Sequence, residues 1–298
     1  MDKFKTYLAA VLSSFFFGIA FVWTKQAFVD FGPITTIFLR LVISIIVIYI
    51  LLSILKSHQK VEKKDYPLFL LGGILSPFIF FITEYEGLTL VTATVGSVII
   101  ATLPLFTPIA AYFFLRERFS PKFLIGLVIS CVGVFITLTT DNFRFNSDIF
   151  GIILESLTVV AGVFYSLVQR KLTQKYNAMT IVLYQNIIGC ILFIPFLFWW
   201  EWGKIIHTVP SFTAIKAVIL LAIFASSGAF ILFTYSIKKL GPSRANLFFN
   251  LMPMFTAFSS FFFLDEKFSL HKIIGICIVL LGLYLSQLTT QQFRKSKK

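Results

Sequence analysis

The sequence predicts an all-α integral membrane protein with ten transmembrane helices arranged as two inverted five-helix repeats. Of its 298 residues, 58% are hydrophobic and 13% are charged, whereas about a quarter are charged in an ordinary soluble domain. Apolar runs long enough to cross a bilayer recur along the whole chain, and the second half repeats motifs of the first. A water-soluble fold of this size cannot bury so much apolar surface. The composition therefore excludes a soluble enzyme, and its many aromatic residues exclude a disordered chain.

The ten spans are apolar runs of about 20 residues, the length that a membrane helix needs. The first follows Lys3 and Lys5, and we interpret it as a retained helix rather than a cleaved signal peptide because nine further spans follow. Turn residues or clusters of charge separate the others. In chain order, the spans are 5–27, 34–55, 66–87, 92–115, 122–140, 149–170, 178–200, 214–237, 242–264 and 272–290. Only short loops and two tails remain, so no soluble domain is expected.

The 26 basic residues are distributed unevenly between the two sides of these spans. With the N-terminus placed inside, 19 lie in inside segments, six in outside segments and one, Arg40, within a span. An excess of Lys and Arg marks cytoplasmic loops. We therefore expect a multi-pass protein of the plasma (inner) membrane with both termini cytoplasmic. The same dispersal argues against nucleic acid as a partner.

A duplication is visible when the sequence is shifted by 149 residues. Residues 103–133 then align with residues 252–282 without a gap, with 13 identities. The identities include proline, glutamate and glycine, which apolar bias alone does not match. Each half holds five predicted helices, an odd number, so the two copies insert with opposite orientation. We place the first repeat at residues 1–141 and the second, with its basic tail, at 142–298. Inverted repeats are a recurring plan of secondary transporters, whose substrate lies at the repeat interface.

The stretch PITTIFLRLVI at residues 33–43, the segments LRERFS at 115–120 and LDEKFS at 264–269, and glycines and prolines in both halves recur in a known pattern. With these motifs the chain resembles the EamA-type branch of the drug/metabolite transporter superfamily. Phe17 is one departure, because the family usually has Trp before Gly18. The resemblance implies ten helices in two repeats and the transport of a small metabolite, such as an amino acid or related compound, often outward. The matching residues are Gly18, Lys25, Pro33, Arg40, Pro104, Glu117, Gly126 and Gly133 in the first repeat, and Gly162, Arg170, Pro253, Glu266, Gly275 and Gly282 in the second.

Charged residues within the spans are candidates for function, because a charge in the bilayer is costly. Arg40, Glu84 and Glu155 lie within spans, and Lys25 ends the first span nearby. One interpretation is a structural ion-pair cluster that locks the helices. The other is that Arg40 holds a substrate carboxylate, while Glu155 or Glu84 takes up a proton that couples transport to the proton gradient.

Two prolines related by the duplication, Pro104 and Pro253, fall near the middle of their predicted helices. Proline removes a backbone hydrogen bond and clashes with the preceding turn. Broken backbone at membrane depth is tolerated only inside protein or beside a water-filled cavity. These residues are therefore candidate hinges or cavity walls, and a simple packing kink is the alternative.

Polar and aromatic residues at similar depths are further candidates for substrate contact. Asn250 lies three residues before Pro253 and is the first choice for a cavity contact. Tyr165, Tyr184 and Trp23 are candidates for an aromatic lining, although packing is the alternative in a chain with 38 Phe and 10 Tyr. The glycines spaced seven apart in each repeat are expected to allow close helix packing.

Motifs of the common catalytic and nucleotide-binding sites are missing. The sequence contains no G-x-x-x-x-G-K-[ST], no H-E-x-x-H and no G-x-S-x-G. Its three cysteines all lie in apolar spans, so we expect no metal and no cofactor. The sequence thus predicts a secondary transporter rather than an enzyme, with a small-molecule solute and the lipid bilayer as its partners. The alternatives are a membrane-embedded lipid-modifying enzyme and a facilitative channel, and the sequence does not indicate an oligomeric state.

Overall fold

The computed structural model describes residues 2–117, 119–138, 148–263 and 270–288, and its regular elements in these ranges are helices. Glu266, a predicted repeat partner of Glu117, lies outside the described residues. The α-helices are α1 (Asp2–Ala27), α2 (Pro33–Ile54), α3 (Tyr66–Gly73), α4 (Phe80–Leu90), α5 (Ala93–Ile100), α6 (Leu103–Leu115), α7 (Pro121–Leu138), α8 (Ile149–Leu172), α9 (Ala178–Phe196), α10 (Trp202–His207), α11 (Phe212–Leu220), α12 (Phe230–Leu240), α13 (Pro242–Asn246), α14 (Met252–Phe263) and α15 (Leu270–Leu288). The 3₁₀ segments are η1 (Lys63–Asp65) and η5 (Leu247–Leu251), and the π-helical segments are η2 (Ile74–Ile79), η3 (Leu197–Glu201) and η4 (Leu221–Ala229).

Eight helical stretches in the described ranges are long and apolar enough to cross a membrane. They are Lys3–Ala27, Pro33–Ile54, Lys63–Leu90, Ala93–Leu115, Ile149–Leu172, Ala178–Glu201, Phe212–Leu240 and Pro242–Phe263. Each overlaps one predicted span, which confirms a helical multi-span membrane protein. The two remaining predicted spans, 122–140 and 272–290, coincide with α7 and α15.

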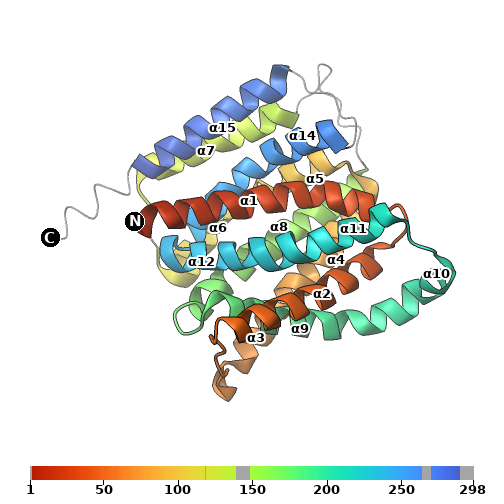
Figure 1. Ribbon diagram of the computed structural model, residues 1–298. Helices are drawn as coiled ribbons and strands as arrows, with labels where there is room; N and C mark the ends of the chain where they lie inside the picture. The colour runs from red at the N-terminus through yellow and green to blue at the C-terminus, as the bar shows by residue number, and fades with distance from the viewer. Residues whose placement is uncertain (1, 118, 139–147, 264–269, 289–298) are drawn as a thin grey trace.

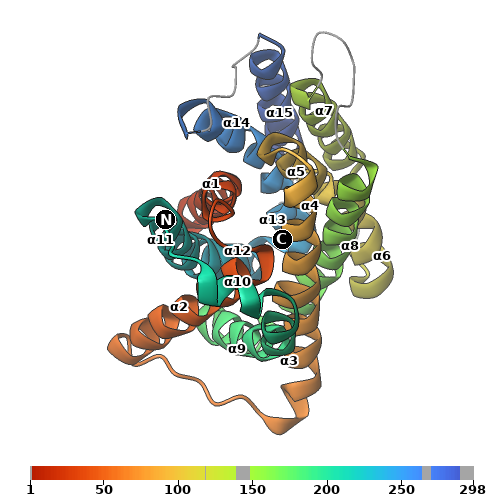
Figure 2. The ribbon, with the colours of Figure 1, turned by 90° about the vertical axis from the view of Figure 1, so that its right-hand side faces the viewer.

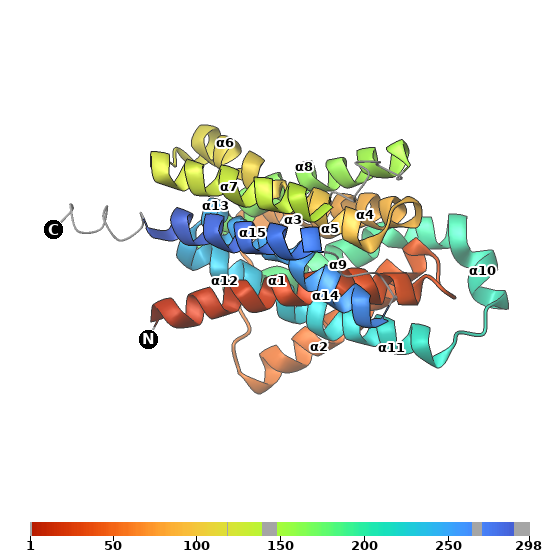
Figure 3. The same ribbon diagram turned by 90° about the horizontal axis from the view of Figure 1, so that it is seen from above.

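The long helices run side by side as a bundle (Figures 1 and 3). The start of α1 and the end of α15 lie at the same end of this bundle, which we call the N-terminal end. Viewed along the helices, α1, α2, α4, α8, α9 and α12 surround the middle of the molecule, while α7 and α15 form a pair at its edge (Figure 2).

Glycine allows α7 and α15 to cross in close contact. A Cβ atom added to Gly133 would lie 2.5 Å from the backbone nitrogen of Val279, and one added to Gly282 would lie 2.7 Å from the carbonyl oxygen of Gly126. Only a residue without a side chain fits such backbone contacts. The predicted close packing of these glycines is confirmed.

Several of the long helical stretches are interrupted along their length. Ser76 has an extended backbone (φ −151°, ψ 126°) before Pro77, as expected for a residue that precedes proline. Two turn residues separate α5 from α6, and η5 leads into α14. Pro104 and Pro253 lie in the first turn of α6 and α14, where a helix needs no N–H from proline. The expected mid-helix kinks therefore take a different form, because each break comes before its proline.

A buried carboxylate caps α2 at the other end of the bundle. Glu201, from η3, accepts hydrogen bonds from the backbone N–H groups of Ile34 (3.1 Å) and Thr35 (2.8 Å) and from the Thr35 hydroxyl (2.6 Å). The first N–H groups of a helix have no partner within it, and a negative charge there is favourable. This contact joins the start of α2 to the end of the α9–η3 stretch.

Candidate functional site

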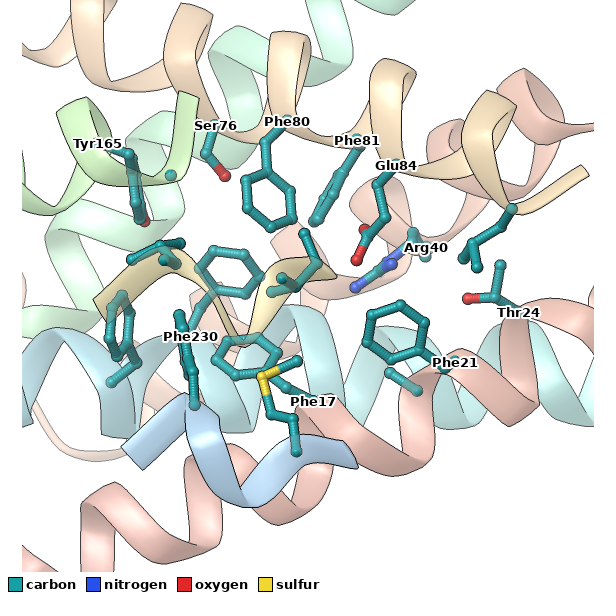
Figure 4. A pocket seen from close by; sticks show the side chains of 18 residues that line it. Phe17, Phe21, Thr24, Arg40, Ser76, Phe80, Phe81, Glu84, Tyr165 and Phe230 are labelled. Atoms are coloured by element: carbon teal, nitrogen blue, oxygen red, sulfur yellow. The ribbon is translucent and has the colours of Figure 1, made fainter. Parts of the chain in front are cut away.

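A narrow cavity of about 40 Å³ lies within the bundle (Figure 4). Small-molecule sites combine apolar walls with a few polar groups, and this cavity has that composition. The polar groups gather at its two ends, with Thr24, Arg40 and Glu84 at one (the Arg40 end) and Ser76 and Tyr165 at the other (the Ser76 end). Its walls are largely aromatic and include Phe17, Phe21, Phe80, Phe81, Phe230, Phe233 and Phe249.

Arg40 is buried and points into the cavity from α2. Its Nε donates to the hydroxyl of Ser226 (2.7 Å), and a terminal nitrogen donates to the hydroxyl of Tyr85. Its guanidinium lies 4.4 Å from the ring centre of Phe81, a distance that favours a cation–π contact. A guanidinium has five N–H donors, so these two hydrogen bonds leave donors for an anionic group.

Glu84 lines the same end of the cavity, one helical turn before Leu88 on α4. Its carboxylate and the Arg40 guanidinium attract each other electrostatically. The two side chains do not form an ion pair within 4.0 Å of each other, unlike Lys175 with Glu62 and Asp65 in a loop of the described chain. The Arg40 end therefore presents groups of both charges.

Glu155 lies just behind this end of the cavity, fully buried on α8. Its Oε1 is 3.0 Å from the position of a Cβ on Gly96 and 3.1 Å from that of a Cβ on Gly87. Neither carboxylate oxygen has a hydrogen-bond partner among the described residues. Lys25 and Glu84 both act on it electrostatically. The structure thus brings together the four charges that the sequence singled out.

Tyr165 leads a hydrogen-bonded group of amides at the Ser76 end. Its hydroxyl donates to Oε1 of Gln185 (3.1 Å) and accepts from Nε2 of Gln169, which also donates to Gln185 Oε1 (2.8 Å). Tyr165 and Gln169 are four residues apart on α8 and share one face of the helix. This end carries hydroxyl and amide groups.

Three predicted contact residues lie away from the cavity. Asn250 is buried and donates to the hydroxyl of Ser130 (2.5 Å) on α7. Tyr184 packs its ring 5.6 Å from that of Phe69, and Trp23 packs 6.0 Å from Phe224. Their positions favour packing over direct contact with a solute.

Sequence reasoning missed several residues of the site, chiefly Thr24, Ser76, Gln169 and Ser226. For Gln169 a signal existed, because it lies one turn from Tyr165. Ser76 directly precedes a proline, which marks an extended residue within an apolar run. Thr24 and Ser226 carry no such mark, since hydroxyl residues are common in membrane helices and often bond to their own backbone.

A partly buried carboxylate lies at the N-terminal end of the bundle, beyond α6. Glu117 accepts a hydrogen bond from Ser243 (3.3 Å), and the positive charges of Arg170 and Arg244 act on it. Burial raises the pKa of this carboxyl above its ordinary value, against the opposite effect of these groups. The duplication first pointed to Glu117, and its contacts join the α6–α7 loop to α13.

Comparisons with known proteins agree with this architecture. The sequence profile of the EamA-like transporter family matches residues 4–139 and 149–288. A protein of Archaeoglobus fulgidus named "Uncharacterized transporter" is 26% identical over 94% of this chain and 98% of its own. "Uncharacterized transporter YetK" of Bacillus subtilis is 25% identical over 85% of this chain and 77% of its own. One solved crystal structure matches with a TM-score of 0.77 at 15% identity, over 97% of this chain and 98% of the other, which shows a shared fold.

Proposed function

The chain belongs to the EamA-like transporter family, and from that premise we propose that it is a secondary carrier of small zwitterionic metabolites, such as amino acids or related compounds, that works by alternating access. Its partners are then the solute and the surrounding lipid bilayer, and it is not an enzyme. The direction proposed is export across the plasma membrane, with both termini cytoplasmic. The excess of basic residues on the side of the termini supports that orientation.

One observation carries the choice of solute. Arg40 and Glu84 line the same cavity inside an apolar bundle without forming a direct pair. Charged residues in membrane helices are costly and face the interior or a partner. A zwitterion supplies a carboxylate for Arg40 and an ammonium group for Glu84, so each charge gains a partner when the solute binds.

The duplicated chain supports alternating access. The family profile matches two stretches of similar length, in line with repeats at 1–141 and 142–298. We propose that α7 and α15 complete a set of ten spans and that the repeats are inverted. The breaks before Pro104 and Pro253 lie at corresponding places in the repeats, where each supplies a hinge. Exchanging the conformations of the two halves then opens the cavity to one side or to the other.

Glu155 is our candidate for proton coupling, with Glu84 as the second. A carboxylate that is buried without donors is costly in its ionised form. Its position beside Gly87 and Gly96, next to the Arg40 end, couples its charge to the charges that meet the solute.

The test is counterflow in proteoliposomes that contain the full chain, with labelled amino acids, other zwitterions, cations and anions. We expect unlabelled zwitterion inside the vesicles to accelerate entry of the labelled compound. If unlabelled zwitterion inside the vesicles does not accelerate entry of the labelled compound although entry occurs, the protein is a channel. Failure of every solute to exchange, with or without a pH gradient, overturns the carrier. Chemical change of vesicle lipids indicates a lipid-modifying enzyme instead.

A further inference from the structure

The Ser76 end of the cavity holds buried polar atoms that lack hydrogen-bond partners. These atoms are Ser76 Oγ, Gln169 Oε1 and Gln185 Nε2, and none of the three residues is more than 1% exposed. Buried polar groups in native proteins are nearly always bonded, and an unsatisfied one costs about 1–3 kcal/mol. Ser76 is the one of these residues that lines the cavity, so a group bound in the cavity is placed to be the partner of its hydroxyl.

Ser76 and Tyr165 are the polar residues that line this end of the cavity (Figure 4), and the Tyr165 hydroxyl already bonds to Gln169 and Gln185. The extended backbone of Ser76 interrupts the α3–η2–α4 stretch at this point. Gln169 and Gln185 stand behind Tyr165 and fix the direction of its hydroxyl through the bonds described above. A Cβ on Gly72 would collide with Nε2 of Gln185, so that amide reaches the helix turn before Ser76.

We propose that the Ser76 end is a second, neutral subsite, which binds a hydroxyl or a similar uncharged hydrogen-bonding group at the far end of the solute. This inference rests on the proposed function, in which the Arg40 end holds the charged groups. The side chains that form the subsite are all uncharged, so a charged group there has no counterion, and its burial is disfavoured. The subsite therefore favours solutes whose far end carries an uncharged hydrogen-bonding group over solutes whose far end is charged.

The two ends of the cavity are separated along one interrupted helix by aromatic residues. Ser76 and Glu84 are eight residues apart on one interrupted helix, which corresponds to about 12 Å at the α-helical rise. Phe80 and Phe81 lie between them and face Phe17 and Phe230 across the cavity (Figure 4). Aromatic walls favour an aromatic or flat apolar body.

The experiment measures binding of three matched pairs to the purified full chain by calorimetry. The pairs are phenylalanine and tyrosine, phenethylamine and tyramine, and 3-phenylpropionate and 3-(4-hydroxyphenyl)propionate. Each pair differs only by the distal hydroxyl, and the three pairs differ in head-group charge. We expect tyrosine to bind about 3- to 10-fold more tightly than phenylalanine, the range that one net hydrogen bond gives.

Two variants assign this preference to the subsite. Ser76→Ala and Tyr165→Phe are each expected to bring the tyrosine-to-phenylalanine ratio close to one, because tyrosine binding is weakened more than phenylalanine binding. Tyr184→Phe removes a tyrosine hydroxyl away from the cavity and is expected to leave the ratio as it is.

Failures of the two proposals are distinguishable. Equal binding of phenylalanine and tyrosine by the wild type, with both lost in Arg40→Gln, overturns the neutral subsite and leaves the proposed function standing. Equal loss of both compounds in Ser76→Ala and Tyr165→Phe also overturns the subsite, because it assigns these residues a structural role. If none of the three head-group classes binds, the proposed solute class fails, and the subsite fails with it.

Discussion

Lys25 and Arg170 make the same kind of contact at opposite ends of the bundle. Lys25 donates to the carbonyls of Leu88 and Val91 (2.7 Å for Val91) at the end of α4. Arg170 donates to the carbonyls of Ile237 (3.3 Å) and Lys238 (2.9 Å) in the last turn of α12. Leu88 and Ile237 are 149 residues apart, the offset of the sequence repeat. A cation at the C-terminal end of a helix is favourable, so each contact fastens one end of the bundle.

Loosening these two contacts is expected to shift the carrier in opposite directions. Lys25→Gln weakens closure at its end of the cavity, and Arg170→Gln weakens closure at the N-terminal end. The measurement is labelling of Phe17→Cys by a membrane-impermeant maleimide, in a chain whose three native cysteines are replaced by alanine. Each variant should raise labelling several-fold from its own side.

Lys171→Gln is the control for that experiment, because it removes an exposed positive charge directly next to Arg170. It should leave labelling from both sides unchanged. An equal rise from the same side in both Lys25→Gln and Arg170→Gln contradicts the assignment of one contact to each end.

Substitution of Arg40 is expected to discriminate between solutes by charge. Arg40→Gln should weaken anionic and zwitterionic solutes by tenfold or more while weakening cations little, since a charge-assisted hydrogen bond contributes about 1.5–3 kcal/mol. Ser226→Ala removes only the hydroxyl that accepts from Arg40 Nε. We therefore expect a smaller loss of binding, which again affects anionic and zwitterionic solutes more than cations. Counterflow inhibition constants provide the measurement. Equal losses for all charge classes would show that Arg40 is structural, and Ser156→Ala, an exposed serine on α8, serves as control.

Glu155→Gln is expected to separate exchange from energy coupling. The change removes a buried group whose oxygens have no donor, so the variant should be at least as stable as the wild type to thermal unfolding in detergent. Exchange at equal pH should persist, while uptake driven by a pH gradient should be lost. Glu86→Gln, a change on α4 near the Arg40 end, is the control and should keep the uptake driven by a pH gradient. Gradient-driven uptake that continues unchanged in Glu155→Gln rules out this residue as the coupling site.

The crossing of α7 and α15 predicts a strong dependence on two glycines. Gly133→Ala and Gly282→Ala each place a methyl group against backbone of the other helix, which costs about 1–3 kcal/mol of stability. Gly203→Ala is the matched control, since nothing lies within 4 Å of a Cβ there. Thermal unfolding in detergent measures the difference. Equal melting temperatures for all three variants would contradict the close packing.

The pH dependence of stability is expected to change when Glu117 is replaced. The folded-state pKa of Glu117 is raised above 4.5 by burial, so its protonated form is the one favoured by folding. Its contribution to stability is full below pH 4.5 and is lost as the pH rises through the folded pKa. Glu117→Gln keeps a neutral group at every pH, so its advantage over the wild type should grow above pH 4.5. Melting temperatures measured between pH 4 and 8 provide the check.

Asp30 gives a comparison of opposite sign. Two hydrogen bonds from Ser211, from its hydroxyl (2.5 Å) and its N–H (2.8 Å), lower the pKa of Asp30 below 3.8. Its contribution is present above pH 3.8 and is lost as the pH falls through the folded pKa. Asp30→Asn should therefore be less stable than the wild type at neutral pH. If the melting temperatures of Asp30→Asn and Glu117→Gln, relative to the wild type, change with pH in the same direction, both assignments are contradicted.

Much of the fold followed from hydropathy, and part of the site followed from charge. Arg40, Glu84 and Glu155 stood out because ionised groups are rare in apolar spans. Which face of each helix meets the cavity was not readable, because both the lipid side and the packed side of a membrane helix are apolar. For that reason Tyr165 and Tyr184 looked alike in the sequence, although only Tyr165 lines the cavity.

The interruptions were readable only where proline marks them. Pro104 and Pro253 pointed to breaks, although each break lies before its proline. The π-helical segment Leu221–Ala229, which carries Ser226 toward Arg40, contains no proline. Local sequence therefore carries no signal for it.

The cap that Glu201 provides for α2 sets an order on biogenesis. Thr35 and its acceptor are 166 residues apart, so α2 enters the membrane long before the ribosome has made the residue that completes it. Until then its first amide groups depend on water or lipid head groups at the surface. The cap of α2 is therefore complete only when the residues around Glu201 have been made and lie beside it.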